Sequence, residues 1–159
     1  KAVEHIAGRS FTDFFDNYVY GTYDYQPLLE ETLSYAGCTI HAHPAKNQTE
    51  RFWGFKTSGD ANKVLITAVA PGSPADLASL APDDLILSIN GYKADATNLQ
   101  AWSEYFGKKD IELTISRNQQ IHEIILTPGK QEYFPNYKVE QLKDATPEQN
   151  AFLKHWIEG

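Results

Sequence analysis

The sequence lacks methionine, contains a single cysteine, and has no apolar run near the length of a membrane-spanning helix. Without a second cysteine no internal disulfide can form, so Cys38 fits a reducing compartment and equally a periplasmic protein that needs no bridge. A helix across a bilayer needs about 20 consecutive apolar residues. The sequence therefore predicts no membrane segment, and it shows no signal peptide. Because methionine is absent, we expect the 159 residues to be a processed chain or a piece of a longer protein.

Basic residues are also scarce: 14 Lys and Arg stand against 21 Asp and Glu, which gives a formal net charge of -7. An acidic chain without a basic patch argues against binding to nucleic acid and to anionic membranes. The hydrophobic content of 42% is enough for a sizeable core. A chain of this size buries about 70% of its unfolded surface, which allows one domain with appendages.

The most informative stretch lies in the middle of the chain. Val64–Val69 is a short apolar run rich in β-branched residues, which is typical of a buried strand. Ser73 can cap a short helix that has Pro74 at its first position. A second apolar run, Leu85–Ile89, precedes the tight-turn signal Asn90-Gly91. This order of strand, capped helix, strand and turn resembles the centre of a PDZ domain of bacterial type.

Two positions depart from the pattern of that family. Ser79 stands where the family prefers Gly, and Asp83 stands where the Gly of a Gly-Asp pair is usual; Asp tolerates a left-handed backbone better than most residues. The resemblance implies an α+β fold: a PDZ-like, partly open β-barrel or sandwich with two helices, flanked by an N-terminal helical hairpin and a C-terminal helix. We expect three parts, residues 1–37, 38–132 and 133–159.

Periodicity and capping signals predict further elements around this centre. The N-terminal helices carry aromatic faces that must pack on the PDZ body or on each other. The expected elements are helices over 10–21 and 27–37, strands over 38–43 and from 52, a helix over 98–106 with a Thr97/Gln100 capping box, strands over 111–115 and 121–126, and a terminal helix with a Thr146/Gln149 capping box.

The segments outside the centre carry a second resemblance. Phe14–Thr22, Leu28-Leu29 and Tyr35–Gly37, together with the tail at Thr146–Gln149 and Trp156, are similar to the C-terminal part of PDZ-containing, glycyl aminopeptidase-type zinc metallopeptidases. This likeness implies that residues 1–37 end an upstream catalytic domain, which would hold the zinc. It brings no catalytic residue and no cofactor into this chain. The implied function is a non-catalytic, peptide-binding or regulatory region of an enzyme that releases small N-terminal residues.

The run Phe52-Trp53-Gly54-Phe55 resembles the carboxylate-binding loop of PDZ domains. Gly54 lets the backbone approach a ligand closely, and successive N–H groups can form an anion-binding nest. An extended peptide would pair with residues 55–57 and meet the helix over 98–106. A larger residue at position 54 is expected to weaken binding without unfolding the domain. The predicted peptide-binding residues are Arg51, Phe52, Trp53, Gly54, Phe55, Lys56, Thr57, Asn98, Ala101, Trp102 and Tyr105.

The alternative is that Trp53 and Phe55 are core residues and that the groove is vestigial or filled from within.

The other motifs give weaker evidence of a functional site. His122-Glu123 lacks the second His that a helical zinc-peptidase motif requires, and Cys38, His41 and His43 lack a fourth ligand. We therefore predict no catalytic or metal-binding residue. The expected partners are peptide or protein segments and the upstream catalytic domain. The functional alternatives are a stand-alone PDZ adaptor and the PDZ module of a serine protease.

Overall fold

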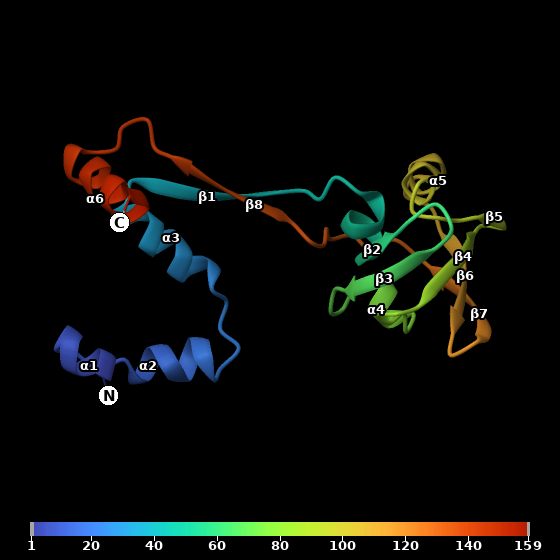
Figure 1. The fold of residues 1–159 in the computed structure, drawn as a ribbon, viewed down its shortest axis with the longest axis horizontal. Helices are drawn as coiled ribbons and strands as arrows, with labels where there is room; N and C mark the ends of the chain where they lie inside the picture. Colours follow the sequence, from blue (N-terminus) through green and yellow to red (C-terminus); the bar gives the residue numbers. More distant parts are fainter. Residues whose placement is uncertain (1, 159) are drawn as a thin grey trace. The chain divides into compact units, whose positions relative to one another are not determined.

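The computed structural model describes residues 2–158 and divides into two compact units (Figure 1). One unit combines Lys1–His41 with Tyr137–Gly159, and the other is Ala42–Asn136. Within the described residues no helix is long and apolar enough to cross a membrane.

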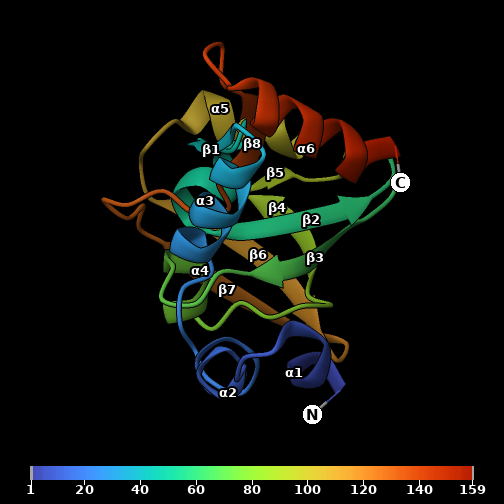
Figure 2. The ribbon, with the colours of Figure 1, turned by 90° about the vertical axis from the view of Figure 1, so that its left-hand side faces the viewer.

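The unit over residues 42–136 is built on an antiparallel sheet (Figure 2). The strand order is β2–β3–β4–β6–β7, and the short strand β5 pairs with β4. The sheet does not close, so β2 and β7 are its edges, and the predicted α+β class with a partly open sheet is confirmed. The elements are η2 (Thr49–Trp53), β2 (Phe55–Gly59), β3 (Val64–Val69), α4 (Pro74–Leu77), β4 (Leu85–Ile89), β5 (Tyr92–Lys93), α5 (Leu99–Phe106), β6 (Ile111–Arg117) and β7 (Gln120–Leu126).

The core of this unit follows from the alternation of the strands. In β6, Ile111, Leu113 and Ile115 point to one face and are fully buried. The side chains of α5 at Leu99 and Ser103 are also buried, and the core cluster extends to Trp53. Ser79 and Asp83, which occupy the two positions where the family pattern has Gly, both adopt a left-handed backbone, with φ of 63° and 72°.

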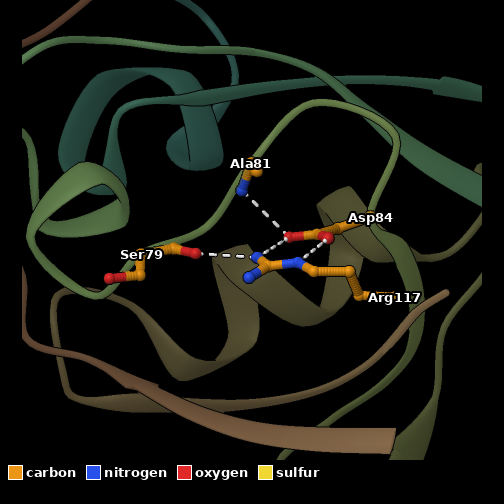
Figure 3. A network of polar contacts seen from close by, with 4 residues as sticks. All are labelled: Ser79, Ala81, Asp84 and Arg117. Atoms are coloured by element: carbon orange, nitrogen blue, oxygen red, sulfur yellow. Dashed lines mark hydrogen bonds and ion pairs between the residues drawn. The ribbon is translucent and has the colours of Figure 1, made fainter. Parts of the chain in front are cut away.

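A buried carboxylate ties the end of α4 to β6 (Figure 3). The Asp84 side chain is 1% exposed, and the Arg117 guanidinium donates to both of its oxygens at 2.6 Å. Arg117 also donates to the carbonyl of Ser79 at 2.7 Å, and the N–H of Ala81 donates to Asp84 at 2.9 Å. The hydrogen bonds that Arg117 donates to Asp84 raise the pKa of Arg117 above its usual value. This network fixes the turn that leads into β4.

The other unit contains helical segments and a two-stranded sheet of β1 and β8. Its small core consists of Leu33, Ala36 and Cys38, with Ile40 and Leu153 packed against it. The N-terminal helix predicted over 10–21 is only partly α-helical, and its second half is a π-helix. The elements are α1 (Ala2–Ala7), α2 (Thr12–Phe14), η1 (Phe15–Val19), α3 (Gln26–Tyr35), β1 (Cys38–His43), β8 (Asn136–Gln141) and α6 (Pro147–Glu158).

The terminal helix α6 begins with the predicted capping box. The N–H of Gln149 donates to the Thr146 hydroxyl at 3.2 Å, and the Gln149 side chain accepts from the N–H of Thr146 at 2.8 Å. The same Gln149 side chain donates to the carbonyl of Ser34 at 2.8 Å. Helix α6 is therefore attached to the end of α3, as expected for segments with apolar faces.

Two local predictions are wrong. The run Phe52–Phe55 does not begin a strand, because residues 49–53 form the π-helix η2, which Gly54 ends with a φ of 75°. The capping box at Thr97 and Gln100 does not form either. Asp95 takes the capping role, since its carboxylate accepts from the N–H groups of Thr97 at 2.9 Å and Asn98 at 3.2 Å.

Candidate functional site

The outer edge of β2 carries backbone groups that point away from the sheet. The N–H of Ala70 donates to the Gly54 carbonyl at 2.8 Å, across the pair formed by Phe55 and Val69. In an antiparallel ladder, such a pair has its own N–H and C=O groups directed away from the partner strand. Phe55 therefore presents both groups outward, and within residues 2–158 no other strand pairs with this edge.

Thr57 presents its backbone in the same direction. Its partner Ile66 uses its N–H and C=O groups on the opposite side, with Asp84 and Asp83, each at 2.9 Å. Ile66 therefore has no backbone group left for β2, so the groups of Thr57 also point outward. The backbone groups of Phe55 and Thr57 thus both point toward the outer edge, where Thr57 is partly exposed and Phe55 is 0% exposed.

Gly54 has an internal reason for being glycine. A Cβ added at this position would lie 2.2 Å from the Ser73 Cβ and 2.6 Å from its Oγ. The N–H of Gly54 donates to the carbonyl of Thr49, so it is not available to the anion-binding nest predicted from the sequence. The tight packing of Gly54 therefore serves the fold first, and the N–H groups at hand for a ligand lie further along, on β2.

The aromatic side chains of the predicted loop belong to the core. Trp53 and Phe55 are fully buried, and Phe52 is 6% exposed. This is the alternative considered from the sequence, and it holds for the side chains of Trp53 and Phe55. Because these exposures are of whole residues, the backbone groups of Trp53 and Phe55 are covered as well, and Thr57 is the partly exposed residue of this edge. Lys56 is exposed, and its ammonium lies 4.8 Å from the centre of the Phe134 ring.

Two cations flank Phe52. The Arg51 guanidinium lies 5.0 Å from the ring centre, and the Lys108 ammonium lies 4.1 Å from it. Arg51, one of the predicted peptide-binding residues, is already bonded through its Nε to Glu132 at 2.7 Å and through its Nη2 to the same oxygen. Lys108 belongs to the connection between α5 and β6.

The predicted residues of α5 differ in what they contact. Trp102 packs against the hydrophobic core that includes Phe55, and its ring lies 4.5 Å from that of Tyr92 in β5 and 6.2 Å from that of Tyr105. Asn98 precedes the helix and closes the preceding loop through hydrogen bonds with Asp95 at 2.9 and 3.1 Å. Ala101 and Tyr105 are exposed.

Sequence reasoning missed the segment that follows β7. The N–H of Tyr133 donates to the carbonyl of Arg51 at 3.0 Å, and the N–H of Gly129 donates to that of Phe52 at 3.4 Å. Glu132 completes this contact through Arg51. Gly129, Glu132 and Tyr133 lie at least 77 positions after Phe52 in the sequence. No local pattern links them, so only the folded chain reveals the contact.

The surface also has hollows away from β2 and α5. One, of about 340 Å³, lies between α4 and the end of β7 and includes Leu77, Ile125 and Tyr133 in its lining. Another, of about 680 Å³, lies in the other unit between α3 and α6 and includes Tyr35 and Trp156. Among the described residues, no three His, Cys, Asp or Glu side chains gather as they would around a metal ion.

Comparison with known proteins agrees with this architecture. Residues 43–116 match the family model of the PDZ domain. PDZ and LIM domain protein 3 of Sus scrofa is 47% identical over 47 residues, which are 28% of this chain and 13% of that protein. The protein of the same name from Rattus norvegicus matches to the same extent. The chain therefore spans a small part of the length of these curated relatives.

Among solved structures, an aminopeptidase N family protein from Idiomarina loihiensis matches with a TM-score of 0.68 and 19% identity. The match covers 94% of this chain and 26% of that one, and at this identity it shows a shared fold. The HtrA3 PDZ domain bound to a phage-derived ligand matches with a TM-score of 0.43 and 17% identity, over 65% of this chain and 92% of that one.

Proposed function

We propose that this chain, which contains a PDZ domain, binds an extended peptide or protein segment along the free edge of β2. The observation that carries the proposal is the unpaired edge of β2, where the N–H and C=O groups of the partly exposed Thr57 point away from β3. A ligand strand that pairs with these groups would extend the sheet by one strand.

The strength of the pairing can be bounded. Four backbone hydrogen bonds at about 1 kcal/mol each would give roughly 4 kcal/mol, which corresponds to a dissociation constant near 1 mM. Useful affinity therefore requires further contacts. We therefore include the exposed residues Lys56, Ala101 and Tyr105 in the proposed site, as contacts for the side chains of the ligand.

The test is an NMR titration of the 15N-labelled chain with a library of extended peptides that have free C-termini. We expect the largest shift changes at the amides of Phe55 and Thr57. The amides of β7, the opposite edge of the same sheet, are the internal control and should stay in place. Shift changes confined to β7 or to residues 2–41 would refute the proposed site.

We also propose that the chain is a non-catalytic region of a zinc metallo-aminopeptidase. The fold shared with the aminopeptidase N family protein over 94% of this chain supports the proposal, as does the resemblance of Phe14–Thr22 to this enzyme class. The zinc would be held by an upstream catalytic domain. In the parent, the PDZ domain would hold peptide substrates or restrict their length.

Reading the coding sequence upstream of Lys1 tests this second proposal. A His-Glu-x-x-His motif there would support a zinc peptidase, because it places two ligands and a general base on one helix face. Its absence would favour an adaptor or the PDZ module of a serine protease. In a parent that has the motif, removal of residues 38–132 should change the preference for peptide length. Unchanged kinetics would show that residues 38–132 have no part in catalysis.

A further inference from the structure

The opposite edge of the sheet, along β7, also has outward backbone groups. In β6, the N–H of Glu112 donates to the Asn90 side chain at 2.7 Å, and its carbonyl accepts from the Asn90 N–H at 2.7 Å. Glu112 therefore has no backbone group left for Ile125, its partner in β7. In an antiparallel ladder, the N–H and C=O groups of Ile125 then point away from β6. Within residues 2–158 no other strand pairs with this edge.

The same direction recurs at every second residue of β7, so Glu123 and Ile121 share it with Ile125. All three residues are exposed, with 68% of Ile121 and 64% of Ile125 accessible. Strand edges that expose apolar residues pair readily with other chains, and natural proteins usually cover such edges or break them with charge. The β7 edge is therefore open to a further strand.

The side chains along this edge lie on the face of the sheet away from the core. Ile124 packs against the core, so Glu123 and Ile125, its neighbours in an alternating strand, project to the other face, as does Ile121. Ile125 also lines the hollow of about 340 Å³ together with Leu77 of α4, which is 80% exposed. The edge thus offers two apolar contacts with one carboxylate between them.

Two carboxylates on this face have no cationic partner. Glu112 and Glu123 are diagonal neighbours on β6 and β7, and in the part of the chain that the structure describes no Lys, Arg or His nitrogen lies within 4.0 Å of either carboxylate. A second copy of the chain that aligned Ile121 with Ile125 would place the two Glu123 side chains opposite each other. Like charges at such a position destabilise a sheet, whereas an opposite charge stabilises it.

We propose that the β7 edge binds an extended, basic segment of another protein. The segment pairs antiparallel with β7, has Lys or Arg opposite Glu123, and has an apolar residue two positions to either side, against Ile121 and Ile125. The net charge of -7 also favours a basic partner over a second copy of this chain. The inference is independent of the proposed binding at β2, because β2 and β7 lie at opposite ends of the strand order.

The experiment uses the 15N-labelled full chain and a peptide with both ends blocked, in which Val, Lys and Val alternate with Thr. A second peptide has Glu in place of Lys. Each is titrated by NMR against wild type, E123Q, E123K and E104Q. Glu104 is the matched control, because it is also an exposed Glu but belongs to α5. The library used for β2 omits this alternating basic pattern, so β7 remains its control.

We expect the Lys peptide to shift the amides of Ile121, Glu123 and Ile125 and to leave that of Thr57 in place. E123Q should weaken this binding roughly two- to fivefold, as for an exposed charge pair, and E104Q should bind as wild type. E123K should prefer the Glu peptide to the Lys peptide. Such a reversal cannot come from a purely structural effect of the substitution, because both peptides are measured on the same variant.

Three outcomes would overturn the inference. If the Lys peptide leaves the β7 amides unshifted, the edge is not a binding site, while the proposed function at β2 stands. If wild type binds the Glu peptide as tightly as the Lys peptide, the carboxylates do not select the ligand. If the free chain dimerises in sedimentation and its β7 amides shift with protein concentration, the edge belongs to a second copy of the chain.

Discussion

Substitution of Gly54 by alanine tests whether this glycine is needed by the fold or by a ligand. The added Cβ would meet the Ser73 side chain at 2.2 Å and 2.6 Å, at a backbone φ of 75°. The left-handed conformation costs a residue with a Cβ about 1–2 kcal/mol. Overpacking adds roughly 1–3 kcal/mol. We therefore expect the G54A variant to lose about 2–5 kcal/mol of unfolding free energy, contrary to the expectation from sequence that only binding suffers.

Gly72 provides the matched control. Its φ is 71°, and a Cβ added there would have nothing within 4 Å. G72A should therefore show the backbone cost alone, about 1–2 kcal/mol. The clash can also be relieved by S73G, which removes the two nearest atoms and leaves the Tyr133 ring, 3.3 Å from the new Cβ. Replacing Ser by Gly at the N-cap of α4 should itself lower stability by only about 0.3 kcal/mol.

The assay is urea unfolding followed by the fluorescence of Trp53 and Trp102, which both belong to the unit over residues 42–136, in a W156F background that removes the emission of the more exposed Trp156. G54A should be less stable than G72A by about 1–3 kcal/mol, and the double variant G54A/S73G should recover most of that difference. Equal stability of G54A and G72A would refute the steric argument. Failure of S73G to restore G54A would place the clash elsewhere.

Three further predictions concern other parts of the chain. Replacing Arg117 by Met should lower the free energy of unfolding in urea by about 3 kcal/mol. This value is at the low end for a broken buried ion pair, because the Arg117 side chain is 35% exposed while that of Asp84 is 1% exposed. A loss below about 1 kcal/mol would contradict this prediction. The hydroxyl of Thr97 is the largest cause that lowers the pKa of Asp95, so T97V should raise that pKa toward its ordinary value in a carboxyl NMR titration, and T97S should not. Because the folded pKa is lowered, the stabilisation by Asp95 is present above the ordinary pKa and is lost as pH falls through the folded one; an unchanged pKa in T97V would refute the assignment. Finally, Trp156 is 58% exposed, so W156A should change stability by less than about 1 kcal/mol, and a loss typical of a core Trp would show that the ring is buried in solution.

Much of the fold follows from local chemistry that the sequence displays. The strand Val64–Val69, the capped helix after Ser73 and the capping box at Thr146 all form where the pattern predicts. Asp83 adopts the left-handed backbone expected for its position. In each case the signal is contained within a few neighbouring residues: periodicity, a capping side chain or a turn residue.

The wrong and missing predictions concern segments whose structure depends on contacts between residues far apart in the sequence. The run at Phe52 has the composition of a strand, yet it ends a π-helix because its side chains fill the core and Gly54 packs on Ser73. Strand β8 was not predicted because its residues are exposed and largely polar, and it forms through its pairing with β1. Lys108 meets Phe52 only after α5 has packed on the sheet, so no spacing rule could identify it.

Amide hydrogen exchange on β2, with and without a bound peptide, tests the central claim most directly. In the free chain, the outward amide of the partly exposed Thr57 should exchange rapidly, and the amide of Lys56, which faces β3, should exchange slowly. With nine tenths of the protein bound, exchange at Thr57 should slow by about tenfold, while Lys56 changes little. Protection of Thr57 that is unchanged by the peptide would show that the ligand does not pair with this edge.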